Sequence, residues 1–263
     1  MRLKSKMRKL LGPDVSLTAP QDLHGFFANL RDHYVPMNLI RIGGDGDGGY
    51  LLPDLREDIS HCFSPGISDI ATFEEEIATS HGINSFMADA SVTAPPTDNP
   101  HFHFQKKFLG SRDSGVLMTL KTWMETSVDP DDDSLLLQMD IEGAEYDVLT
   151  LESAETLRRF NCMVIEFHGV QEIFHANFFR VFSAIFDKIF QNFSICHLHP
   201  NNYYGTIINH GIATPQIMEI TFVRNDMIAA HKTDGPIQLP HPLDRPNVAE
   251  KPDIIMPDIW WKS

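Results

Sequence analysis

The stretch that decides the fold spans residues 135–146 and reads Leu135-Leu136-Leu137-Gln138-Met139-Asp140-Ile141-Glu142-Gly143-Ala144-Glu145-Tyr146. Its apolar first half is typical of a strand buried on both faces, and its acids begin where that strand ends. A second run, residues 164–169, repeats the pattern, and strand alternation places Glu166 and His168 on one side. The two runs therefore predict neighbouring strands that carry carboxylates and an imidazole to one rim of a sheet.

Short apolar strands alternate with helical patterns on either side of this stretch, which predicts an α/β protein with a mainly parallel sheet. The last two strands have no helix between them, so we expect an antiparallel pair at the sheet edge. The expected strands are 59–67, 83–88, 101–109, 135–141, 163–167, 193–198 and 217–223, and the expected helices are 72–80, 119–125 and 175–192.

Length, composition and charge exclude several classes of protein. The 263 residues suffice for one large domain, and no apolar run is long enough to span a bilayer. A net charge of -15 would repel nucleic acids and anionic lipid surfaces. The three cysteines are widely spaced and lie in apolar runs, so we interpret them as reduced core residues. We therefore expect a soluble, cytoplasmic protein without a nucleic-acid partner.

The composition changes near both ends of the chain. We expect an N-terminal tail and lead-in helix over residues 1–37, the main domain over 38–230, and a proline-rich extended segment over 231–263. The basic residues 1–9 are not followed by the apolar stretch of a signal peptide, which indicates a surface tail. The final Ile259-Trp260-Trp261 is apolar enough to dock on the body or on a second subunit, which leaves a homo-oligomer open.

A glycine-rich run, residues 44–49, formally satisfies the G-x-G-x-x-G pattern of dinucleotide-binding turns. Such a turn should open a helix, but Tyr50-Leu51-Leu52 leads directly into Pro53. We therefore expect a hairpin loop here rather than a nicotinamide site, either purely structural or a tight, mobile loop near a ligand.

Two other positions suit a ligand. The turn at Gly66 follows the first strand of the alternation, and Asp89 ends the next strand, where it could accept hydrogen bonds from ribose hydroxyls.

His197 and His199 lie two residues apart on one strand, which would suit a metal, but we expect solvated edge-strand residues.

Together these runs resemble the FkbM-type family of S-adenosylmethionine-dependent methyltransferases, over about residues 39–225. The resemblance implies a Rossmann-like class I methyltransferase fold, in which a seven-stranded, mostly parallel sheet has an antiparallel last strand and helices on both faces. The residues that carry it are 63–68, Phe73, Glu74, Asp89, 108–111, 139–145 and 164–168.

The resemblance also implies where the cofactor binds. The turn around Gly66 would line its methionine part, Asp89 would hold the ribose, Leu109 to Ser111 would border the adenine, and Asp140 would lie near the transfer site. The full expected set is Ser64, Pro65, Gly66, Ser68, Glu74, Asp89, Ala90, Leu109, Gly110, Ser111 and Asp140.

Methyl transfer to a hydroxyl needs a base for the hydroxyl proton. We expect His168 or Glu142 to be that base, with Asp140 and Glu166 either orienting it or, with His168, binding a divalent cation such as Mg²⁺.

The resemblance implies an O-methyltransferase whose acceptor is a sugar, a glycan intermediate or a small secondary metabolite. Polar amides and aromatic rings in the loop 201–204 suit contacts with such an acceptor. Two alternatives stay open: a catalytically silent, methyltransferase-like binding module and a nicotinamide-dependent oxidoreductase.

Overall fold

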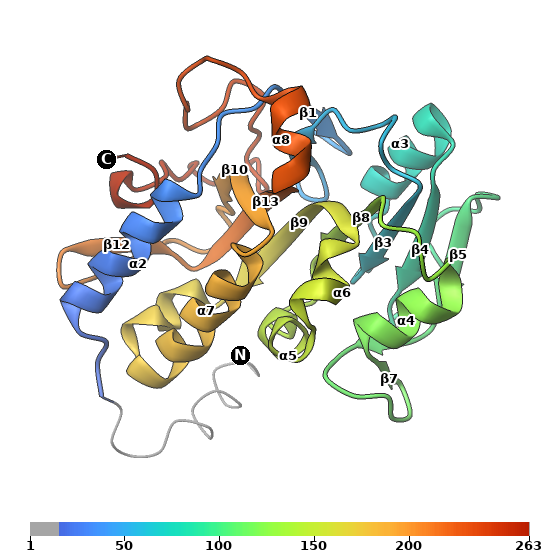
Figure 1. The fold of residues 1–263 in the computed structure, drawn as a ribbon, viewed down its shortest axis with the longest axis horizontal. Helices are drawn as coiled ribbons and strands as arrows, with labels where there is room; N and C mark the ends of the chain where they lie inside the picture. The colour runs from blue at the N-terminus through green and yellow to red at the C-terminus, as the bar shows by residue number, and fades with distance from the viewer. Residues whose placement is uncertain (1–15, 263) are drawn as a thin grey trace.

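The computed structural model describes residues 16–262, and the expected basic surface tail at residues 1–9 lies outside them. Its centre is a seven-stranded sheet in the order β10-β13-β9-β8-β3-β4-β5 (Figure 1). The strands are β3 (His61–Pro65), β4 (Asn84–Ala88), β5 (Phe102–Gln105), β8 (Leu135–Met139), β9 (Phe160–His168), β10 (Phe193–Pro200) and β13 (Ile217–Arg224).

Six of these strands, β5, β4, β3, β8, β9 and β10, run in the same direction, and β13 is antiparallel to its neighbours β9 and β10. The prediction of an α/β protein with a seven-stranded, mostly parallel sheet is confirmed. The strand expected over residues 101–109 is split, because a tight turn, in which Lys107 N–H donates to the Gln105 carbonyl (2.8 Å), separates β5 from β6 (Phe108–Leu109).

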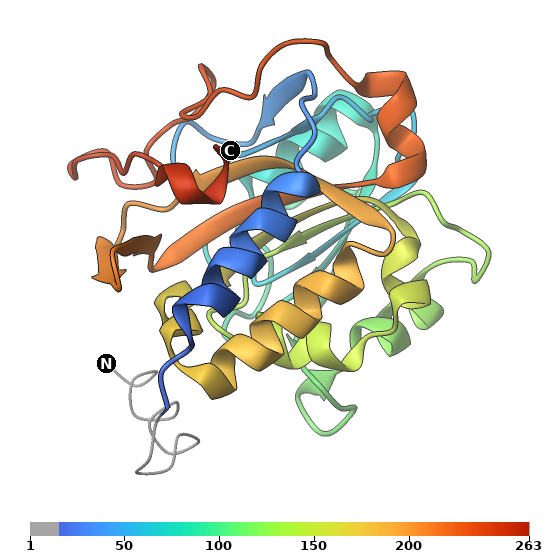
Figure 2. The same ribbon diagram turned by 60° about the vertical axis from the view of Figure 1, so that its left-hand side comes forward.

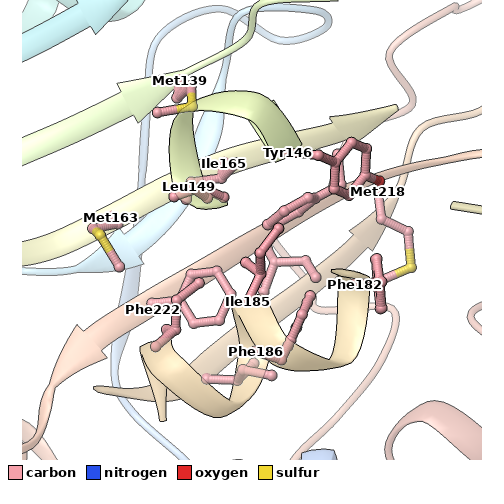
Figure 3. Close-up of a cluster of buried hydrophobic side chains, with 14 of the residues drawn as sticks. Met139, Tyr146, Leu149, Met163, Ile165, Phe182, Ile185, Phe186, Met218 and Phe222 are labelled. Carbon is pink, nitrogen blue, oxygen red and sulfur yellow. The ribbon is translucent and has the colours of Figure 1, made fainter. Parts of the chain in front are cut away.

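One face of the sheet is covered by α2 (Pro20–Asp32), α4 (Leu120–Ser127), α5 (Glu145–Leu151), α6 (Ala154–Arg158) and α7 (Ala176–Ile189). Figure 3 shows the contact at α7, whose Phe182, Ile185 and Phe186 pack against Met218 and Phe222 of β13. These apolar residues recur every three to four positions along α7, so one stripe of the helix is buried.

The other face carries α3 (Thr72–His81) and a hairpin of β1 (Leu39–Ile42) and β2 (Tyr50–Pro53). The hairpin confirms that the glycine-rich run 44–49 does not open a helix. Cys62, Cys162 and Cys196 all lie in the core beneath this face, buried and unpaired, as expected for structural thiols.

A second hairpin, formed by β11 (Thr206–Asn209) and β12 (Ile212–Pro215), joins β10 to β13 where we expected only a loop. A short helix, α8 (Ile228–His231), follows β13. Among residues 16–262, no helix is both long and apolar enough to cross a bilayer.

The C-terminal segment after α8 is mostly irregular, with turns and bends, and in Figure 2 it runs on the side of the β1–β2 hairpin, away from α7. Its end docks on the body of the same chain. Trp260 is fully buried, its ring lies 4.7 Å from that of Phe27 in α2, and its Nε1–H donates to the Ala213 carbonyl (3.2 Å).

Candidate functional site

A cavity of about 500 Å³ opens at the carboxyl ends of β3, β4 and β8, in the size range of small-molecule sites. After β3 the chain forms β4, which pairs with one edge of β3. It later forms β8, which pairs with the other edge of β3. Ligands of open α/β sheets bind at such a point, where the strand order reverses. Its lining includes the turn after β3, the end of β4, the first residues after β8, and part of the β1–β2 hairpin.

The turn after β3 depends on Gly66, whose φ is 93°. A Cβ built on Gly66 would overlap the carbonyl oxygen of Asp140, so the backbones after β3 and β8 touch here without room for a side chain. Ser68 also has a left-handed backbone, with φ of 44°, and its N–H donates to Asp89 Oδ2 (3.0 Å).

Asp89 has two sets of contacts. Its Oδ1 accepts hydrogen bonds from the Ser91 N–H (2.7 Å) and hydroxyl (2.6 Å), as a turn residue does, and its side chain also lines the cavity. Because each carboxylate oxygen can accept more than one hydrogen bond, these contacts leave capacity for ligand hydroxyls.

The acids and imidazole predicted at one rim do meet there. His168 Nε2 lies 3.5 Å from Glu166 Oε1 and 3.8 Å from both Asp140 Oδ1 and Glu142 Oε2. Asp140 and Glu142 line the cavity, and His168 lies behind them, almost buried. The side chain of Glu142 is 88% exposed, whereas Glu166 is buried beside the imidazole.

Burial and charge shift the proton affinities of this group. Burial raises the pKa of Asp140 to about 7, although His168 opposes the shift, and it also raises the pKa of Glu166 well above its ordinary value. Burial by itself would lower the pKa of His168, but the hydrogen bond to Glu145 and the surrounding carboxylates raise it to about 9. At neutral pH the imidazole is therefore protonated among the carboxylates.

Glu145 holds this arrangement together, although the sequence analysis gave it no role. Its Oε1 accepts hydrogen bonds from the N–H groups of Ile141 (3.2 Å) and Gly143 (3.0 Å), and from His168 Nδ1 (3.1 Å). Because Oε1 can only accept, His168 Nδ1 carries a hydrogen and Nε2 faces Asp140 and Glu142. The sequence signal for this role was the position of Glu145 in the first turn of α5, directly after Gly143 and Ala144.

We expect the substitution Glu145→Gln to lower the pKa of His168 from about 9 towards the ordinary value of about 6.5. The variant keeps the size and an accepting oxygen but removes the charge that favours the imidazolium. A proton NMR titration of the histidine resonances measures the shift, and Glu152→Gln, at a buried carboxylate bonded to Lys121 N–H, is the matched control. An unchanged pKa in Glu145→Gln would show that the other carboxylates hold the proton.

A buried polar chain joins the cavity to the β1–β2 hairpin, and it links two residues of the expected cofactor set to Gln138 and Tyr50, which the sequence analysis did not single out. Gln138 Nε2 donates to the Tyr50 hydroxyl (3.1 Å), and the Ser64 hydroxyl contacts both Gln138 Oε1 (2.6 Å) and Glu74. Burial raises the pKa of Glu74 to about 7. The signal for this chain was Gln138, a polar residue in an otherwise apolar strand.

The cavity brings together only part of the expected cofactor set. Gly66, Ser68, Glu74, Asp89, Leu109 and Asp140 line it. Its lining does not include Ser64, Pro65, Ala90, Gly110 or Ser111. Apolar wall near Leu109 comes instead from Phe108 and from Leu117, which opens β7 (Leu117–Met118), because these two short strands pair beside the cavity.

Two expectations about β10 and the loop after it need correction. His197 and His199 are not solvated: both are buried, because the C-terminal segment covers this strand and contacts them through Asp244 and Asn247. In the loop 201–204, Asn201 and Asn202 are buried and hydrogen-bonded within the protein, which leaves Tyr203 and Tyr204 exposed.

The potential cation ligands also differ from the expected trio. Ligand atoms of Asp140, Glu142 and His168 lie within 4.8 Å of one another, so Glu142 rather than Glu166 completes this group. Glu166 instead accepts a hydrogen bond from Asn201 Nδ2 (3.1 Å), and its Oε2 has no partner among the described residues.

Comparison with known proteins gives a family match. No curated protein matches the chain. The family model of the methyltransferase FkbM domain matches residues 60–196, slightly more than half of the chain, from the residue before β3 into β10. The match confirms the resemblance, over a shorter range than expected, since the β1–β2 hairpin and β13 lie outside it. The chain therefore belongs to the FkbM methyltransferase domain family.

Proposed function

We propose that this methyltransferase is a cytoplasmic, S-adenosylmethionine-dependent O-methyltransferase with a Rossmann-like class I fold. Its acceptor would be a hydroxyl of a sugar, a glycan intermediate or a small secondary metabolite. The observation that carries the proposal is one cavity, with the Gly66 turn and Asp89 on one side and Asp140 and Glu142, backed by His168, on the other.

The cavity suits the cofactor, which supplies an electrophilic methyl group on a sulfonium centre. The Gly66 turn allows close backbone approach to the methionine part, and Asp89 offers carboxylate oxygens to the ribose hydroxyls. Leu109 and Leu117 provide apolar wall for the adenine. In this proposal the other expected residues support the cavity from outside its lining, namely Ser64 and Pro65 in β3 and Ala90, Gly110 and Ser111 in loops.

The protein's contribution to transfer is alignment and removal of a proton. In this proposal His168 takes the acceptor's proton at Nε2, while Glu145 holds Nδ1–H. Asp140 and Glu142 flank Nε2 on the cavity side and would orient the hydroxyl. Glu142 is the second candidate for the base, because its side chain is the most exposed among Asp140, Glu142, Glu166 and His168.

Mg²⁺ does not fit this group well. Mg²⁺ prefers octahedral oxygen coordination, whereas here an imidazole nitrogen lies close to both cavity-lining carboxylates. We therefore derive no step through a cation and expect transfer to continue in EDTA.

The experiment that tests the proposal is a calorimetric titration of the EDTA-treated protein with S-adenosylhomocysteine and, separately, with NAD. Binding of S-adenosylhomocysteine alone is expected, followed by methylation of sugar acceptors from S-adenosylmethionine in EDTA. Transfer that is lost in EDTA and restored by Mg²⁺ would overturn the cation-free mechanism.

Other outcomes point to the alternatives. Binding of NAD alone would favour the oxidoreductase. Binding of S-adenosylhomocysteine without turnover on any hydroxyl acceptor would favour the silent binding module. Silence from both ligands would contradict the assignment of the cavity.

A further inference from the structure

A second group of potential ligands lies apart from the cavity lining, between β10 and the C-terminal segment. Ligand atoms of His197, His199 and Asp244 lie within 4.8 Å of one another, and all three side chains are buried. The family match ends at residue 196, just before the first of them. We propose that these three residues form a Zn²⁺ site that fastens the C-terminal segment to the edge of the sheet.

The three donors are of the kinds that Zn²⁺ prefers. Zn²⁺ favours imidazole nitrogen and carboxylate oxygen in a tetrahedron, with bonds of about 2.0–2.1 Å and therefore ligand separations of about 3.3 Å. Asp244 Oδ1 lies 2.8 Å from His197 Nε2 and 3.6 Å from His199 Nδ1, which brackets that value. Water would supply the fourth ligand.

Hydrogen bonds behind the ligands determine which ring nitrogen of His199 carries its hydrogen. The amide nitrogen of Asn247 donates to Glu219 Oε1 (2.6 Å) and Asp47 Oδ1 (3.2 Å), so Asn247 Oδ1 is an acceptor. His199 Nε2, 3.2 Å from that oxygen, must then carry the ring hydrogen. In a neutral ring this leaves the lone pair of His199 Nδ1 facing Asp244, as in metal sites whose histidine donates its other N–H to an outer partner.

Asp244 is fixed in the same way. Its Oδ2 accepts the N–H of His241 (2.6 Å), which turns Oδ1 towards the two imidazoles. A nitrogen lone pair and a carboxylate oxygen that face each other repel unless a cation lies between them. That cation is either a metal ion or a proton on His199, whose pKa Glu219 and Asp244 raise to about 9 against the effect of burial, and the experiment distinguishes the two.

The location suggests what the ion would do. Asp244 and Asn247 belong to the segment that passes the β1–β2 hairpin, and Asn247 contacts Asp47, which lines the cavity. An ion on His197 and His199 would therefore hold the segment against the hairpin and so stabilise one wall of the cavity. Binding to the folded state alone would raise the unfolding temperature.

The test uses the untagged full chain, freed of metal with EDTA and then dialysed. Titration with ZnCl₂ is expected to give one high-affinity Zn²⁺ per chain, and calorimetry a higher unfolding temperature. Co²⁺ is expected to give the visible absorption spectrum of a tetrahedral site. Asp244→Asn and His199→Gln should each weaken Zn²⁺ binding by at least about 100-fold, because a ligand is lost.

The control is His168→Gln, which alters the other potential metal group and should leave Zn²⁺ affinity unchanged. Absence of Zn²⁺ binding to the wild-type chain would overturn the proposal and leave a hydrogen-bonded latch with a proton on His199. Equal Zn²⁺ affinity in wild type, Asp244→Asn and His199→Gln would overturn it as well. If both ligand variants fail to fold, two other results test the site. A tetrahedral Co²⁺ spectrum of the wild type and unchanged Zn²⁺ affinity in His168→Gln would support it, and failure of either would overturn it. The outcome does not depend on whether the protein transfers methyl groups.

Discussion

Replacing His168 by alanine is expected to lower kcat for methyl transfer by about 10²- to 10⁴-fold, the usual contribution of a general base. S-adenosylhomocysteine affinity should change little, because His168 lies behind the carboxylates that line the cavity. Single-turnover assays with a methylatable acceptor, together with calorimetric titration, measure the two quantities separately.

The pH dependence gives this prediction a specific signature. Only the deprotonated imidazole can take a proton, and the pKa of His168 is about 9. The wild-type rate should therefore rise about tenfold per pH unit below pH 9 and level off above it. The His168→Ala variant should lose this rise, whereas a rise centred near pH 7 would point to Asp140, whose pKa is about 7.

The matched control is His175→Ala, at an imidazole that also contacts a carboxylate, Glu172 (2.7 Å), but lies outside the cavity lining. It should leave kcat and the pH profile unchanged. If Glu142→Gln abolishes transfer while His168→Ala does not, Glu142 is the base and the assignment of His168 is wrong.

The substitution Gly66→Ala is expected to weaken S-adenosylhomocysteine binding by at least about 100-fold, or about 3 kcal/mol, and to destabilise the fold. A left-handed backbone with a side chain costs about 1–2 kcal/mol. The larger effect comes from the overlap between the new Cβ and the Asp140 carbonyl, which forces apart the two turns that form the cavity.

The variant Gly82→Ala separates the cost of a left-handed backbone from the effect of the Cβ overlap. Gly82 ends α3 with φ of 65°, but a Cβ there meets nothing within 4 Å. It should therefore show the backbone cost alone, with a modest fall in unfolding temperature and unchanged cofactor affinity. Wild-type affinity in Gly66→Ala would contradict the role of this turn in the site.

Much of the fold follows from local patterns. The apolar run of β8 and the stripe on α7 each encode their element within a few residues, because burial on a strand or helix repeats with a fixed period. The proline that ends β2 excludes a helix directly after the glycine-rich run. The meeting of Asp140 and Glu142 with His168 was predictable too, since parallel neighbouring strands end at the same edge.

The cofactor turns were less predictable because lining a cavity depends on side-chain direction. Gly110 and Ser111 follow β6 in sequence, yet Phe108 and Leu109 of that strand, with Leu117 of its partner, line the cavity. Spacing along the chain cannot indicate which of several consecutive turn residues points inward.

The sequence by itself determined the α/β class, the hairpin at residues 44–49 and the acidic rim, because each depends on neighbours in the chain or on strand polarity. Only the tertiary structure decided that Glu145 holds His168, that Gly66 contacts Asp140, and that residues 244–247 bury His197 and His199. The last of these joins segments more than 40 residues apart, and no periodic pattern of burial encodes which distant segment covers a strand.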